Sequence, residues 1–172
     1  MSRTWRWAIN IVILSILLAC LGVIYKLTVK PPSFMLNCSS ELFNRQQSLE
    51  DNKHYLLVDL FSKDGQAQIN YRYFDLEGNS AGSVSMQGQV NSIDLDNMLY
   101  DISVKTKQEF PHSNLDLAPE HYKYLSYVSS LNLNKKGMHN LSVRVLERDE
   151  GKDFAVVLFQ PSNTVCGCRL VN

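Results

Sequence analysis

The sequence predicts a mainly β protein, in which one small antiparallel domain follows a single N-terminal hydrophobic helix. Residues 7–25 form a run of 19 residues without a charge. From residue 55 onward, apolar and polar residues alternate with a period of two, and turn-forming residues separate the alternating segments. The chain has 172 residues, which is enough for one domain with its own core after the helix.

The N-terminal run, WAINIVILSILLACLGVIY, predicts a transmembrane helix over residues 7–25. At about 1.5 Å of rise per residue, this run matches the roughly 30 Å hydrocarbon core of a bilayer. Residues typical of the membrane interface flank it on both sides: Arg3, Trp5, Arg6, Trp7, Tyr25, Lys26 and Lys30. We therefore expect residues 1–6 to be a cytoplasmic tail and the domain to lie outside the cytoplasm.

Two other interpretations of the run are weaker. Leu17 to Cys20 resemble the lipobox of a lipoprotein, with Cys20 as the residue that would carry the lipid. The apolar run continues past Cys20, where a mature lipoprotein turns polar, and Leu18 fits the motif poorly. An ordinary signal peptide is disfavoured because no small-residue cleavage site closes the run. We expect an uncleaved anchor.

Residues 26–37 are predicted to be a linker, and residues 38–172 the outer domain. Pro31 and Pro32 end the hydrophobic helix and favour an extended backbone. The segment 39–52 is predicted to be a short helix, because a serine can cap it, Glu41 lies in its first turn and it has a partial apolar face.

Seven later segments are predicted to be strands, the first because it is an apolar run that ends at a turn sequence, and most of the others because their side chains alternate between apolar and polar. They are residues 55–61, 67–73, 84–90, 98–106, 138–145, 153–160 and 165–171. Gly82 and Gly88 near and within the third segment predict a bulge or a tight bend. Joined mostly by tight turns, these strands predict an antiparallel meander that closes into a barrel or a sandwich.

The segment 108–134 gives the weakest pattern. Pro111 and Pro119 break it. Four apolar residues then recur every three positions and favour one or two helical turns, although a strand fits nearly as well: Tyr122, Leu125, Val128 and Leu131.

Three cysteines lie at the two ends of the predicted domain, which favours an oxidising compartment. A bond from Cys38 to either Cys166 or Cys168 closes a loop of about 130 residues, for which chain entropy predicts about 4 to 5 kcal/mol of stabilisation. One cysteine of the C-G-C pair is then left over, and exchange of disulfide partners is a second, sharper hypothesis. The histidines and cysteines show no metal-ligand spacing, so no metal or cofactor is predicted.

The charge distribution gives no sign of nucleic-acid binding. Four of the 17 basic residues lie in the first 30 residues, which contain no acid, so the rest of the chain has 13 basic and 17 acidic residues. The chain has no hydrolase, phosphate-binding or dinucleotide motif, so we predict that it is not an enzyme.

Six of the eight tyrosines lie in the middle of the chain: Tyr71, Tyr73, Tyr100, Tyr122, Tyr124 and Tyr127. Tyrosine is favoured where one edge of the ring is apolar and the other is wet. These residues are predicted to form the core and rim of the barrel, or else the lining of a pocket or a partner surface.

The organisation resembles the FidL-like inner-membrane proteins of enteric bacteria and, more distantly, the ToxS-type partners of ToxR-type transmembrane regulators. The likeness lies in the basic start and anchor from Arg3 to Lys30, the position of Cys38, the strand AGSVSMQGQV and a cysteine-containing last strand. It covers most of the chain through its architecture, and the second cysteine of the C-G-C end departs from it.

The resemblance implies a bacterial inner-membrane protein with a periplasmic domain that pairs with a membrane-bound transcriptional regulator. It also implies a lipocalin-like barrel, which some members of the wider group build together with their partner and use to take up a bile-salt-like amphiphile. We therefore expect a non-enzymatic accessory protein that stabilises or activates such a regulator. The alternative is a stand-alone barrel that binds a lipid or a bile-salt-like molecule.

Overall fold

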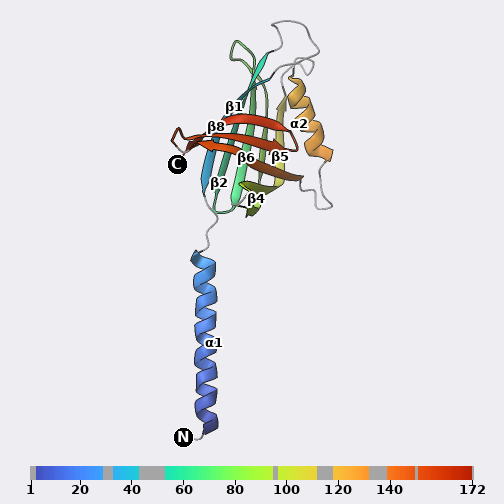
Figure 1. Ribbon diagram of the computed structural model, residues 1–172. Helices are drawn as coiled ribbons and strands as arrows, with labels where there is room; N and C mark the ends of the chain where they lie inside the picture. The colour runs from blue at the N-terminus through green and yellow to red at the C-terminus, as the bar shows by residue number, and fades with distance from the viewer. Residues whose placement is uncertain are drawn as a thin grey trace. The chain divides into compact units, whose positions relative to one another are not determined.

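The protein is described by a computed structural model over residues 3–28, 33–42, 53–94, 97–111, 118–131, 139–149 and 151–171. The chain divides into two compact units, Met1–Pro31 and Pro32–Asn172. The first unit contains the helix α1, and the second contains eight antiparallel strands and a shorter helix α2 (Figure 1).

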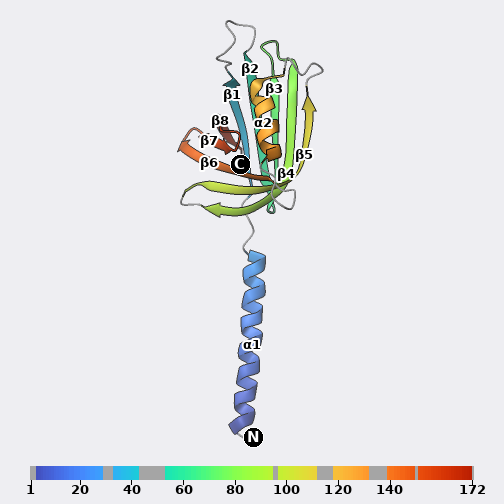
Figure 2. The same cartoon turned by 90° about the vertical axis from the view of Figure 1, so that its right-hand side faces the viewer.

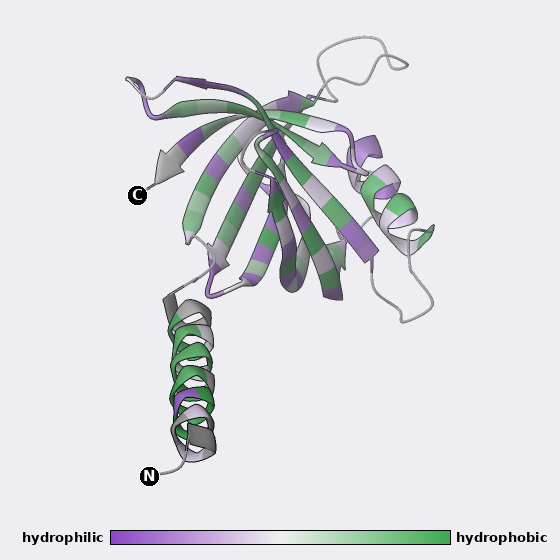
Figure 3. Cartoon of the chain, turned by 60° about the horizontal axis from the view of Figure 1, so that its bottom comes forward, coloured by the Kyte–Doolittle hydropathy of each residue, from purple (hydrophilic) through white to green (hydrophobic). Residues whose placement is uncertain are grey.

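Helix α1 spans Arg3–Thr28. Hydrophobic residues dominate its length (Figure 3), and the large apolar side chains described between Ile9 and Ile24 are all exposed. The Ser15 hydroxyl donates a hydrogen bond to the carbonyl oxygen of Ile11 at 2.9 Å, which satisfies this polar group within the helix. Measured over the described residues alone, no helix of the protein combines the length and the hydropathy needed to cross a membrane.

The second unit is a closed eight-stranded barrel. Its strands are β1 (Phe34–Leu42), β2 (His54–Lys63), β3 (Gln66–Phe74), β4 (Ser80–Asp94), β5 (Leu99–Pro111), β6 (His139–Asp149), β7 (Phe154–Gln160) and β8 (Thr164–Val171). Each strand pairs antiparallel with the next, and β8 pairs with β1. Figures 1 and 2 show that β6–β8 run across the direction of β1–β3, and that β4 and β5 bend from one direction into the other. Helix α2 (Glu120–Leu131) lies between β5 and β6 in the chain.

Turn chemistry sets the register of the first hairpins. Asp64 and Gly65 join β2 to β3 with φ angles of 50° and 79°, as a two-residue hairpin turn with positive φ at both positions requires. Between β3 and β4, the Asp75 carboxylate accepts hydrogen bonds from the backbone N–H groups of Glu77 at 3.0 Å and Asn79 at 2.8 Å.

Alternate residues of every strand fill the barrel. Tyr71, Tyr73 and Phe159 are among the largest side chains that are fully buried, and the rings of Tyr71 and Phe159 meet edge to face at 6.2 Å. An eight-stranded barrel has an interior just wide enough for side chains to occupy, and these aromatic rings occupy it.

A β-bulge changes which face of β5 points inward. Opposite β4, Gln87 pairs with Thr106 while Gly88 pairs with Val104, so Lys105 is the extra residue. Before the bulge the buried apolar residues are Ile102 and Val104. After it, Lys107 and Glu109 take the inner positions, and Thr106, which the alternation of Ile102 and Val104 would place inside, is exposed.

The predicted mainly β fold and the predicted barrel are confirmed, whereas the predicted short helix over 39–52 is wrong for its first four residues. Residues 39–42 belong to β1, and residues 43–52 lie outside the described part of the chain. Strand β1 begins at Phe34, before the expected end of the linker. Its residues pair with both β2 and β8, and these long-range ladders override the weak local helix signals.

Candidate functional site

The three domain cysteines lie on the inner faces of β1 and β8. Cys38 and Cys168 face each other in the β1–β8 ladder and form a disulfide with a sequence separation of 130. Cys166, two residues earlier on the same inner face, is free and buried. Burial raises the pKa of Cys166 to about 12. Because the thiolate is the species that attacks a disulfide, this environment disfavours exchange with the neighbouring bond.

The six predicted tyrosines divide into two groups. Tyr71, Tyr73 and Tyr122 are buried, and the rings of Tyr73 and Tyr122 meet edge to face at 5.6 Å. The other three lie apart from this cluster. Tyr100 packs its ring against Phe34 at 4.7 Å, and Tyr124 and Tyr127 are exposed on α2.

A chain of hydrogen bonds connects α2 to the inside of the barrel. His121 contacts the Tyr73 hydroxyl through Nδ1 at 2.9 Å and the Thr164 hydroxyl through Nε2 at 2.7 Å. Thr164 donates to the Ser162 hydroxyl at 2.7 Å, and Ser162 donates to the carbonyl oxygen of Phe159 at 3.1 Å. Because the Thr164 proton points to Ser162, Thr164 accepts from His121. This direction assigns the His121 proton to Nε2 and makes Tyr73 the donor to Nδ1.

Burial keeps these groups neutral. It lowers the pKa of His121 to about 4 and raises the pKa of Tyr73 well above its ordinary value. Burial also raises the pKa of Tyr71, whose hydroxyl has no hydrogen-bond partner among the described residues. At neutral pH these hydrogen-bonded side chains are therefore uncharged, and they hold the first turn of α2 in place.

A second polar cluster holds the other end of α2. The Lys107 ammonium forms an ion pair with Glu109 at 2.6 Å and donates to the Ser126 carbonyl and to the Ser129 and Ser130 hydroxyls at 2.9–3.2 Å. The Ser126 hydroxyl donates to both oxygens of Glu109. Burial alone would raise the pKa of Glu109, but the hydrogen bonds from Lys107 and Ser126 outweigh it and lower this pKa.

His139 opens β6 beside this cluster and is fully buried. Neither of its ring nitrogens has a hydrogen-bond partner in the described part of the chain. Burial, and then the charge of Lys107, lower the pKa of His139. Among the described residues, no group of three or more His, Cys, Asp or Glu side chains could hold a metal ion.

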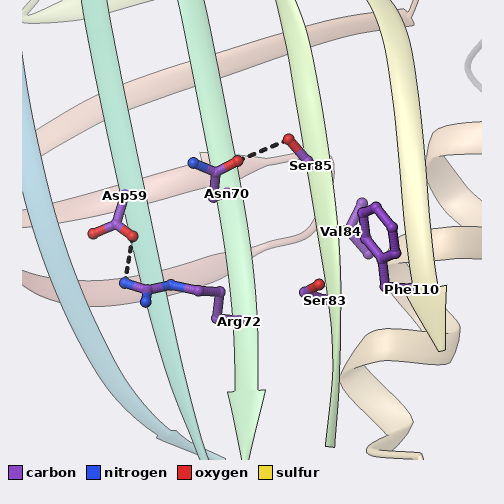
Figure 4. A pocket seen from close by; sticks show the side chains of 7 residues that line it. All are labelled: Asp59, Asn70, Arg72, Ser83, Val84, Ser85 and Phe110. Atoms are coloured by element: carbon purple, nitrogen blue, oxygen red, sulfur yellow. Dashed lines mark hydrogen bonds and ion pairs between the residues drawn. The ribbon is translucent and has the colours of Figure 1, made fainter. Parts of the chain in front are cut away.

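A hollow of about 420 Å³ lies on the outer face of β2–β5 (Figure 4). Asp59, Asn70, Arg72, Ser83, Val84, Ser85 and Phe110 line it. The Arg72 guanidinium donates to Asp59 at 2.6 Å, and the Ser85 hydroxyl donates to the side-chain oxygen of Asn70 at 2.8 Å. Neither this hollow nor the two polar clusters under α2 was predicted from the sequence.

One available signal points to the polar cluster of β5. A lysine and a glutamate stand two positions apart, so Lys107 and Glu109 must share a face in any strand, and charged side chains on a strand bordering the core need a polar partner. His121 gave no comparable signal because Tyr73 and Thr164 lie 48 and 43 residues away.

The sequence matches no protein-family model and no curated protein.

Proposed function

We propose that the protein is a membrane-anchored, non-enzymatic accessory protein whose barrel binds and stabilises or activates a ToxR-like transmembrane transcriptional regulator. The observation that carries the proposal is an apolar strip on the outer face of β7 and β8, on a barrel whose inside is occupied by its own side chains. The identity of the partner rests on the resemblance to the FidL-like and ToxS-type proteins.

The apolar strip consists of the outward residues of two paired strands: Phe154, Val156, Leu158 and Val165. Phe154 and Val165 are 43% and 49% exposed, and the other two are half-buried. Charged residues of both signs stand beside the strip in the register: Arg144, Glu147, Asp149 and Arg169. An apolar centre with a charged rim is typical of a protein–protein interface.

The barrel interior favours this external role over an internal amphiphile. Tyr71, Tyr73 and Phe159 are fully buried inside it, so a bile-salt-like ligand at their positions would have to displace them. The ladder is closed by strands of this chain alone, since β8 pairs with β1. We therefore propose that the partner contacts the outside of the barrel and supplies no strand to it.

We further propose that α1 is the membrane anchor, with residues 1–6 in the cytoplasm and the barrel in the periplasm of a bacterial inner membrane. This proposal rests on the sequence alone, because the 19 uncharged residues 7–25 have the length that a helix needs to match the hydrocarbon core. Carbonate extraction of membranes tests it, because an anchored chain stays in the pellet and a peripheral chain is released.

Co-purification tests the partner surface. Tagged full-length chain is crosslinked in membranes of its host, and the recovered proteins are searched for a transmembrane protein with a cytoplasmic winged-helix domain. Val165→Arg places a charge in the strip, and Leu76→Arg is the matched control because Leu76 is 50% exposed in a turn between β3 and β4. We expect recovery to fail with Val165→Arg and to persist with Leu76→Arg. Equal recovery with both variants would exclude the strip as the interface.

The amphiphile hypothesis has its own readout. If the barrel binds a bile salt alone, taurodeoxycholate raises the Tm of the purified full chain in the absence of any partner, and a detergent of similar charge does not. The partner proposal predicts no such selective rise.

A further inference from the structure

We propose that the hollow on the outer face of β2–β5 is a binding site for a neutral sugar, one pyranose unit of an oligosaccharide. This site lies on other strands than the apolar strip of β7 and β8, and nothing in the proposed partner role requires it. Its volume of about 420 Å³ falls within the roughly 300–1,000 Å³ range of small-molecule sites.

The hollow has the hydrogen-bonding groups that a sugar ring requires. The register aligns one row of outward side chains across five strands: Asn37, Asp59, Asn70, Ser85 and Gln108. A second row contains Arg72, Ser83 and Phe110. Every sugar hydroxyl both donates and accepts, and amide, carboxylate, guanidinium and hydroxyl groups offer both functions. Figure 4 shows these side chains around the hollow.

The charges of the hollow favour a neutral ligand. Among the described residues that line it, only Asp59 and Arg72 are charged, and their ion pair at 2.6 Å cancels both charges. Asn37 donates to the other oxygen of Asp59 at 2.6 Å. A phosphate would have to compete with Asp59 for Arg72, and a cation would have to compete with Arg72 for Asp59. A polyhydroxylated neutral molecule adds hydrogen bonds without breaking the pair.

Fixed side chains and one exposed ring complete the site. The side-chain oxygen of Asn70 accepts from Ser85 at 2.8 Å and from Gln68 at 3.3 Å, which holds the plane of its amide. Arg72 is 45% exposed, so N–H groups that do not reach Asp59 remain accessible. Phe110 is 56% exposed at the edge of the hollow and offers an apolar platform for the C–H face of a pyranose. Side chains held in place before binding lose little entropy when the ligand arrives.

The same features disfavour a protein partner in the hollow itself. A protein interface has an apolar centre that is depleted of polar groups, whereas this lining has amide, hydroxyl and ion-paired side chains and a single exposed aromatic ring. The apolar strip of β7 and β8 has the opposite character. The two outer faces are thus suited to different classes of ligand.

Saturation-transfer NMR and calorimetry on the full chain test the proposal, in a detergent whose headgroup is not a sugar. The probes are maltotriose, cellotriose and the trimer of N-acetylglucosamine. We expect saturable binding of at least one trimer, and at least a tenfold loss of affinity with Phe110→Ala. Leu146→Ala is the matched control, because Leu146 is a similarly exposed apolar strand residue outside both the hollow and the apolar strip, and it should bind like the wild type.

Arg72→Gln gives a second test, because glutamine keeps a donor but breaks the ion pair with Asp59. We expect this variant to bind the trimer at least fivefold more weakly, with an unchanged Tm. The proposal is overturned if none of the three trimers binds the wild type, or if Phe110→Ala and Arg72→Gln both bind with wild-type affinity.

Discussion

Cys38 and Cys168 lie directly opposite each other on the first and last strands of the barrel, and their disulfide covalently closes the seam between β1 and β8. The bond spans nearly the whole domain, with a sequence separation of 130. Without the disulfide, the unfolded chain has more conformational entropy, because the bond no longer closes so large a loop.

Replacing Cys38 with alanine should lower the free energy of unfolding by about 4 to 5 kcal/mol, because a loop of this length carries that closure entropy. Denaturant unfolding of the full chain, followed by far-UV circular dichroism, measures the loss.

The matched control is Cys166→Ala, which alters a buried free cysteine on the same inner face of β8. It removes one sulfur from the core, so we expect a loss of about 1 kcal/mol. Alkylation before and after unfolding, without reductant, should label Cys166 only in the unfolded chain and leave Cys38 and Cys168 unlabelled. Comparable losses for the two variants would contradict a stabilising role for the bond.

Gly88 is the second position where a small change should have a large effect. A Cβ atom at this position would overlap the carbonyl oxygen of Ser103, a backbone atom of the paired strand that cannot move away independently. We expect Gly88→Ala to destabilise the barrel by about 3 kcal/mol, measured by the same unfolding experiment.

Gly151→Ala is the control for Gly88→Ala. A Cβ there would lie 3.4 Å from a carboxylate oxygen of Asp149, which is ordinary contact with a side chain, so we expect a change within about 0.5 kcal/mol. Equal stability of the two alanine variants would show that β4 and β5 can separate at the bulge.

The strands could be predicted wherever a strand buries one face over its whole length. In β3, Ile69, Tyr71 and Tyr73 point inward while Gln68, Asn70 and Arg72 point outward, and this alternation is visible in the sequence. Strand β1 lacked so clear a signal because Met35 is exposed and Ser40 is an inward residue, and its partners lie far away in the chain. Non-local pairing decided its structure.

The candidate sites were less predictable because they depend on register and on long-range contacts. The bulge at Lys105 reverses the faces of β5, so Lys107 lies on the inner face although alternation from Ile102 predicts the outer one. His121 meets Tyr73 only because α2 packs against the barrel. The proposed sugar site combines residues from four strands, and none of these residues stands out in the sequence.

Acidification should destabilise the barrel at pH values well above those at which carboxylates titrate. The pKa of His121 is lowered to about 4 by burial, against about 6.5 in the unfolded chain, and the pKa of His139 is lowered by burial and by Lys107. The unfolded state therefore binds protons that the folded state excludes. The contribution of His121 is complete above pH 6.5 and is lost as the pH falls from 6.5 towards 4.

Because of His121 alone, the free energy of unfolding should decrease by about 2 kcal/mol from pH 7 to pH 5, and His139 adds to this decrease. The pKa of Glu109 is lowered, so the contribution of Glu109 to stability is lost only at a pH below this window. Unfolding of the full chain at pH 7, 6 and 5 measures the effect. His121→Gln keeps an acceptor for Tyr73 and a donor for Thr164 but does not titrate, so its stability should depend less steeply on pH. An equal pH dependence in the wild type and in His121→Gln would mean that His121 takes up its proton as readily in the barrel as in the unfolded chain.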